Sequence, residues 1–237
     1  MSLFLRTLVA IVVVAVWAPQ VRAADVGSPV RTVEVSFVGN DPYGEDPPSG
    51  SDSDSNTSLG QWDTDVSVSG GGAFADSAQN SNINDQSLTF EAYGFAKTSL
   101  YVQGTAEAEA SSVFQFDFLM EDPGSLVLDG SVIGVTDFFG TTSSHDRPGQ
   151  ARIEVRVIDL GTSQVVYSAV VEMDGEINNP YGILEFTFED DDAEIELPVG
   201  NYRLVIEATS SDSANQEQVE FSLANAFYEV EGYIQED

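Results

Sequence analysis

The clearest candidate for chemistry in this sequence is an acidic stretch over residues 52–63, DSDSNTSLGQWD. Side chains that carry oxygen recur at its first, third, fifth and seventh positions, and a carboxylate ends it, which is the ligand spacing of an EF-hand calcium loop. Thr57 stands where that loop needs glycine for its sharp turn, so a solvated Asp/Ser linker is the alternative interpretation. The candidate ligands are Asp52, Asp54, Asn56, Ser58 and Asp63.

A second acidic run, EDDDAE, lies at residues 189–194. Consecutive carboxylates repel one another unless a cation or solvent separates them, so bound calcium is a hypothesis here too. Asp190, Asp191 and Asp192 are the candidate ligands. A solvated connection between two strands is the alternative.

The formal net charge of −32 excludes some partners and favours others. DNA, RNA and anionic lipids require positive patches, so we expect no nucleic-acid role. Divalent cations are the expected partners, with calcium as the cofactor because hard carboxylate oxygens suit it. The chain has no cysteine, which excludes disulfides and thiolate metal sites.

Four aromatic residues in polar surroundings are candidate platforms for a bound sugar. Stacking on a sugar needs a flat ring held outward, and each of these rings could instead cover the protein core. The candidates are Trp62, Tyr181, Phe138 and Phe139.

Catalytic groups are not evident in the sequence. The single histidine, His145, lies beside Asp146 in a hydroxyl-rich stretch. Adjacent residues of a strand point to opposite faces, and no Gly-x-Ser-x-Gly motif supplies a nucleophile. Acids are so numerous that sequence spacing identifies no glycosidase pair. We therefore expect a solvated loop histidine and no catalysis.

The elements that must position these residues are β-strands. Phe114, Phe116 and Phe118 alternate with polar residues, the period of two that turns one face of a strand toward a core. The turn sequence Asp122-Pro123-Gly124 follows, so we predict a hairpin over 113–135 at the centre of the fold. The same alternation marks roughly ten strands, including residues 106–110, and no amphipathic helix. The fold class is all-β, an antiparallel β-sandwich with jelly-roll topology.

The chain divides into four parts. Residues 1–23 resemble a signal peptide, because Arg6 precedes an apolar run that is too short to span a bilayer of about 30 Å. We expect secretion, no membrane span after its removal, and a mature chain two charges more negative. An N-terminal strand within 24–38 joins the main sheet, 39–61 is an acidic loop or linker, and 62–237 is the β-sandwich domain. A further loop is predicted over 77–86.

Two phrases in the sequence resemble those of uncharacterised exported bacterial β-sandwich proteins. The first runs from Ala110 through Phe118 to the LVLDG sequence at 126–130, and the second is LPVGNYRL at 197–204. Many such proteins end in a sorting tail with a Pro-Glu-Pro motif, which is absent here. The resemblance implies the fold and carries no functional residue over.

Together these patterns predict a secreted, non-catalytic binding or cell-surface protein that is stabilised by calcium. Its expected partner is an extracellular glycan or another surface component. Two alternatives stay open: a secreted carbohydrate-active enzyme on a jelly-roll scaffold, and a structural subunit of an extracellular layer.

Overall fold

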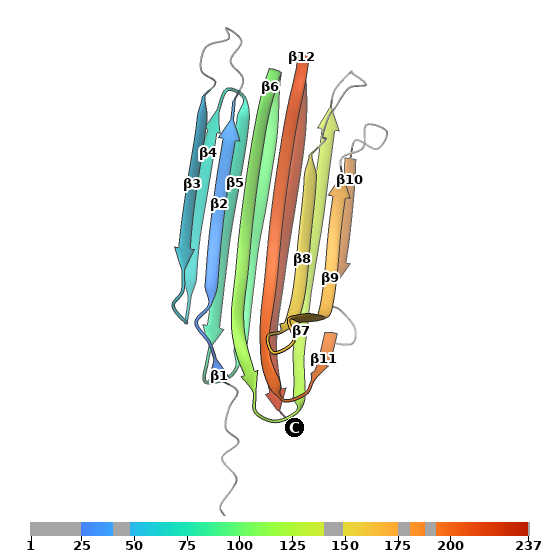
Figure 1. Ribbon diagram of the computed structural model, residues 1–237. Coiled ribbons are helices and arrows are strands. Elements are labelled where there is room, and N and C mark those ends of the chain that lie inside the picture. Colours follow the sequence, from blue (N-terminus) through green and yellow to red (C-terminus); the bar gives the residue numbers. More distant parts are fainter. Residues whose placement is uncertain (1–24, 40–47, 140–148, 175–180, 188–192, 237) are drawn as a thin grey trace, which may run out of the picture.

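The computed structural model describes residues 25–39, 48–139, 149–174, 181–187 and 193–236 (Figure 1). These residues form strands and turns, and they contain no helix. The strands are β1 (Asp25–Val26), β2 (Val30–Val38), β3 (Ser49–Asn56), β4 (Trp62–Gly70), β5 (Ala73–Asn84), β6 (Thr89–Met120), β7 (Gly124–Phe139), β8 (Gln150–Asp159), β9 (Gln164–Asp174), β10 (Tyr181–Thr187), β11 (Ala193–Leu197) and β12 (Gly200–Glu236).

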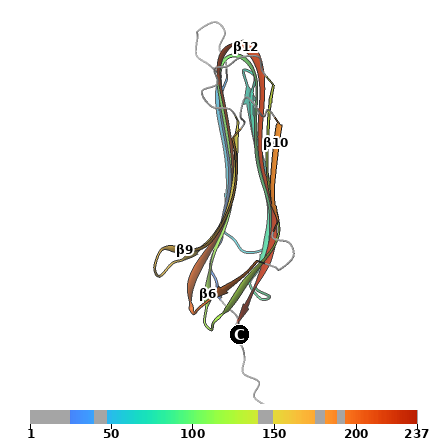
Figure 2. The same cartoon turned by 90° about the vertical axis from the view of Figure 1, so that its right-hand side faces the viewer.

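Two long strands, β6 and β12, hold the molecule together. They pair antiparallel along most of their length, with an irregularity between Gln216 and Glu220. The C-terminal part of β6 pairs with the N-terminal part of β12 in one sheet, which we call sheet I. The other parts of both strands pair in a second sheet, which we call sheet II. Figure 2 shows the two layers meeting at one end, where β12 passes from one to the other.

The order of strands in the two six-stranded antiparallel sheets follows from the pairing. Sheet I has the order β3-β2-β6-β12-β8-β9. Sheet II has the order β4-β5-β6-β12-β7-β10, and β11 pairs with the other end of β7. The predicted antiparallel β-sandwich is confirmed.

The pairs are nested as in a jelly roll. The N-terminal part of β6 pairs with the C-terminal part of β12 in sheet II, and the remaining parts of both strands pair in sheet I. The next pair inward is β7 with β10 in sheet II, and the last is β8 with β9 in sheet I. Eight strand segments thus pair from the outside inward and alternate between sheets, which is jelly-roll topology. Strands β2–β5 widen both sheets on one side.

The core contains the predicted phenylalanine face of β6. Phe114, Phe116 and Phe118 are at most 2% exposed, and the centroids of neighbouring rings lie 5.7 and 5.8 Å apart. Burying such a face stabilises a sandwich by roughly 1.5–3 kcal/mol for each fully buried side chain. The predicted strand at 106–110 is also confirmed, with its alanines turned inward.

The predicted hairpin over 113–135 is wrong in one respect. Both segments are strands and Asp122-Pro123-Gly124 does turn the chain, but β6 does not pair with β7 there. Each pairs with a different part of β12, so the turn crosses from sheet I to sheet II. Turn residues reverse the chain locally, whereas partner choice depends on distant strands.

Two segments predicted as loops are strands. Ser49–Asn56, inside the predicted linker, forms β3 at the edge of sheet I, and Ala73–Asn84 forms β5 through the predicted loop at 77–86. Neighbouring backbones supply the hydrogen bonds that these polar sequences do not signal. Between the sheets, the Ser77 hydroxyl donates to the Ser111 carbonyl at 2.6 Å, which satisfies one of the buried polar groups of β5.

Candidate binding groove

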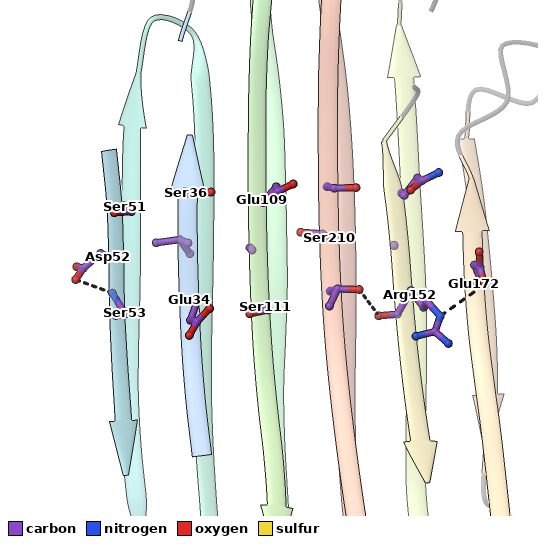
Figure 3. Close-up of a pocket in the computed structure, with 16 residues that line it drawn as sticks. Glu34, Ser36, Ser51, Asp52, Ser53, Glu109, Ser111, Arg152, Glu172 and Ser210 are labelled. Carbon is purple, nitrogen blue, oxygen red and sulfur yellow. Dashed lines mark hydrogen bonds and ion pairs between the residues drawn. The ribbon is translucent and has the colours of Figure 1, made fainter. Parts of the chain in front are cut away.

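A groove of about 740 Å³ lies on the outer face of sheet I. Figure 3 shows its side chains standing on all six strands of that sheet, from β3 at one edge to β9 at the other. We call this feature the cross-strand groove.

The groove follows two rows of outward side chains that the pairing register places side by side. Their neighbours along each strand, such as Val35 and Ala110, point into the core. One row consists of Ser53, Glu34, Ser111, Thr209, Arg152 and Glu172. The other consists of Ser51, Ser36, Glu109, Ser211 and Gln150.

Short hydroxyl side chains leave the middle of the groove open, with Ser111 on β6 and Thr209 and Ser211 on β12. Longer side chains stand on both sides of this floor. Six strands at a spacing of about 4.8 Å give the groove a length of roughly 24 Å across the sheet. It therefore fits an extended chain that crosses the strands better than a compact molecule.

The one cationic side chain that lines the groove is Arg152. Its Nη2 atom lies 2.7 Å from Oε2 of Glu154, and its Nε atom lies 3.6 Å from Oε2 of Glu172. These two carboxylates flank the guanidinium, which is itself partly exposed. The groove thus offers a guanidinium donor, carboxylate acceptors and hydroxyls that do both.

The outer face of sheet II carries two smaller adjoining hollows of about 520 and 300 Å³. Two tyrosines stand there, Tyr93 at 44% and Tyr233 at 42% exposure. Between them, Glu231 of β12 lies opposite both Glu91 of β6 and Asp129 of β7. Opposed like charges in a sheet are unfavourable, so this face is a second, more acidic surface.

Among the four predicted aromatic platforms, only Trp62 has a side chain within the described part of the structure. Trp62 is 9% exposed and packs into the core. It is therefore a ring that covers the core, which was the alternative interpretation, and not an outward platform. Phe138 and Phe139 belong to β7, and Tyr181 belongs to β10. The side chains of these three lie outside the described residues.

The predicted EF-hand-like loop is not formed, because its first half is extended. Asp52 and Asp54 lie on β3, where each accepts a hydrogen bond from the next backbone amide, at 2.9 and 2.8 Å. Asn56 ends β3 and accepts a hydrogen bond from the Ser58 amide at 2.8 Å, while Asp63 lies on β4 opposite Asn80. An extended strand does not wrap these oxygens around one ion.

Within the described ranges, no group of three or more acidic, histidine or cysteine side chains is arranged to hold a metal. Asp190, Asp191 and Asp192 lie outside those ranges, as do His145, Asp146 and the predicted signal peptide at 1–23. No helix of the described chain has the length and apolar character needed to cross a membrane.

Two charged side chains are buried between the sheets, away from the groove. Arg31 is fully buried, and its Nη2 atom donates to the Gly60 carbonyl at 2.8 Å. Burial lowers its pKa. Asp212 is 3% exposed, and burial raises its pKa to about 7, with smaller opposing effects of the Ser222 hydroxyl and the Ser213 amide.

Apart from Asp52, which was a candidate calcium ligand, the groove residues were not predicted as a site from the sequence. Alternation did mark Glu34 and Ser36 of β2, and Arg152 of β8, as outward positions. That pattern contained no information on which strands would be neighbours. The sequence therefore indicated which side chains of each strand point outward, but not that these side chains form one groove.

A scan against models of protein families finds no match, and a search of curated proteins finds none either. Among solved structures, the chain is similar to one described as TmCBM61 in complex with beta-1,4-galactotriose. The two are 10% identical with a TM-score of 0.22, over 67% of this chain and 88% of the other. A TM-score of this size does not relate the cross-strand groove to a site in that protein.

Proposed function

We propose that this protein is a non-catalytic binding protein that holds an extended glycan chain in the cross-strand groove. The observation that carries the proposal is the register itself. It aligns eleven outward, hydrogen-bonding side chains in two rows over six strands. A polymer rich in hydroxyls matches such rows because every sugar unit both donates and accepts hydrogen bonds.

The charge of the groove narrows the class of glycan. Glu34, Glu109 and Glu172 line it, together with Asp52 at the β3 edge, against one arginine. A polyanionic polysaccharide would meet repulsion from this surface and from the net charge of the whole chain. We therefore propose a neutral or amino-bearing glycan.

We further propose that the protein acts outside the cell and that calcium stabilises it. The signal-like sequence at 1–23 and the large excess of carboxylates support these two parts. Both rest on the sequence, and neither depends on the groove.

The test is binding of the mature domain to an array of neutral, amino-bearing and anionic glycans, followed by calorimetry on the best ligand. Ser111→Phe fills the floor of the groove and should abolish binding. The matched control is Ser131→Phe, which places the same ring on the outer face of sheet II. Loss of binding in the control variant alone would assign the site to the other face.

Catalysis is tested in the same samples. We expect no release of new reducing ends from the bound glycan over a long incubation. Release that disappears in Ser111→Phe would support the carbohydrate-active enzyme instead. Anionic glycans that bind best would contradict the charge argument.

A further inference from the structure

One edge of sheet I is open and is uncharged over residues 164–171. In the part of the chain that the structure describes, β9 pairs only with β8, with a register shift between Val165 and Tyr167, so its other side presents unpaired backbone groups. Val165, Val166 and Val170 are 52%, 47% and 46% exposed there. Figure 2 shows the end of the β8–β9 hairpin turning away from the other layer.

The other long edges carry acids. Asp52 and Asp54 are exposed on β3, the other edge of sheet I. Asp63 and Asp65 are exposed on β4, an edge of sheet II. Charged side chains on an edge strand discourage pairing with another chain. Residues 164–171 of β9, QVVYSAVV, contain no charged side chain in a protein with 40 acids. The protection found on β3 and β4 is therefore missing from β9.

We propose that β9 is a dimerisation edge at which a second copy of this chain adds antiparallel, about a two-fold axis through Ser168. This inference is independent of glycan binding. An axis at that residue pairs Val166 with Val170 of the second copy on the outer face, and Tyr167 with Ala169. Glu172 then lies opposite Gln164 of the second copy, so no like charges are directly opposed.

Moving the axis by one residue removes this match. An axis at Ala169 would place exposed Val166 opposite Glu172, and an axis at Tyr167 would pair Val166 with Ser168. An axis at Val166 would pair that residue with its own copy but place Val170 opposite Thr162. The register at Ser168 is the one in which both Val166 and Val170 face an exposed valine. Self-complementarity of this kind is what a two-fold interface requires.

Net charge opposes the association, because each copy carries −32. Screening shortens the range of that repulsion from about 30 Å at 0.01 M to about 3 Å at 1 M ionic strength, while contacts between valines persist. The dimer should therefore tighten as sodium chloride increases. An interface held by ion pairs would weaken instead.

The register is tested with single cysteines, since the native chain has none. Facing Cα atoms in an antiparallel pair lie about 4.5–5.5 Å apart, within the range of a disulfide. Ser168→Cys should form a disulfide-linked dimer on mild oxidation. Val166→Cys and Val170→Cys should each cross-link poorly alone and well when mixed. The control is Ser69→Cys, at an exposed position on the β4 edge.

Sedimentation at 0.05 and 0.5 M sodium chloride provides the second readout. Val166→Lys should raise the dissociation constant of the dimer by about tenfold or more, and Val199→Lys, at a residue 58% exposed elsewhere, should not. Three results would overturn the proposal: a monomer at both salt concentrations, a ladder of larger oligomers, or Ser168→Cys cross-linking no faster than Ser69→Cys.

Discussion

Replacing Asp212 with asparagine should change how the stability of this protein depends on pH. Asp212 lies on the inner face of β12, and neither of its carboxylate oxygens makes a well-formed hydrogen bond within the described residues. The Ser222 hydroxyl and the Ser213 amide lower its pKa, but burial outweighs them and raises the pKa to about 7. Asparagine has a similar shape and does not titrate.

The sign and size of this pH effect follow from the difference between the pKa values of Asp212 in the folded and the unfolded chain. An aspartate in the unfolded chain has a pKa of about 3.9, so below that pH both states hold the proton and the group has no effect. As pH rises toward 7, the native state keeps its proton while the unfolded state releases it, which favours unfolding. The wild-type protein should lose about 1.4 kcal/mol per pH unit, or about 4 kcal/mol in total, relative to Asp212→Asn.

The assay is urea unfolding of both proteins from pH 4 to pH 8 at constant ionic strength. The difference between their free energies of unfolding isolates Asp212, because the remaining acids are common to both. Asp159→Asn is a control that should add almost no pH dependence over this range, since the Thr162 hydroxyl and the Gly161 amide lower the pKa of Asp159 below its usual value. Wild-type and Asp212→Asn curves that stay parallel from pH 4 to pH 8 would refute a buried, protonated carboxyl group.

Three further predictions concern the core and the acidic surface. Phe116→Ala should lower the free energy of unfolding by roughly 3–5 kcal/mol, and a loss below about 1 kcal/mol would show that the ring is not in the core. Gly94→Ala should lower the melting temperature, because the added methyl would meet the Tyr228 hydroxyl and lie 2.6 Å from Ser112 Oγ; an unchanged melting temperature would show that β6 can move there freely. Calcium at a hundred times its dissociation constant should add about 2.7 kcal/mol of stability, and equal shifts with magnesium or matched sodium chloride would leave only screening. The double variant Asp52→Asn with Asp54→Asn should still be stabilised more by calcium than by magnesium if the ions bind elsewhere than on β3.

Much of the local structure could be predicted from the sequence, because the alternation of side chains along a strand is a local property. Phe114, Phe116 and Phe118 point inward as predicted, and so do the alanines before them. The hairpin of β8 and β9 has the same local origin, because turn residues at 161–163 adjoin two alternating segments. Strands β3 and β5 escaped prediction, since their serines, aspartates and asparagines become strands only when neighbours offer backbone partners.

Local sequence patterns therefore specify the class of the fold and the two faces of most strands. The tertiary structure alone decided which strands are neighbours. It bent β6 and β12 through both sheets, turned the expected hairpin at Asp122 into a crossing between layers, and brought Glu34, Ser111 and Arg152 into one row. The physical reason is that a side chain's face depends on residues next to it in sequence, whereas a groove across six strands depends on pairings between segments as distant in sequence as Glu109 of β6 and Ser211 of β12.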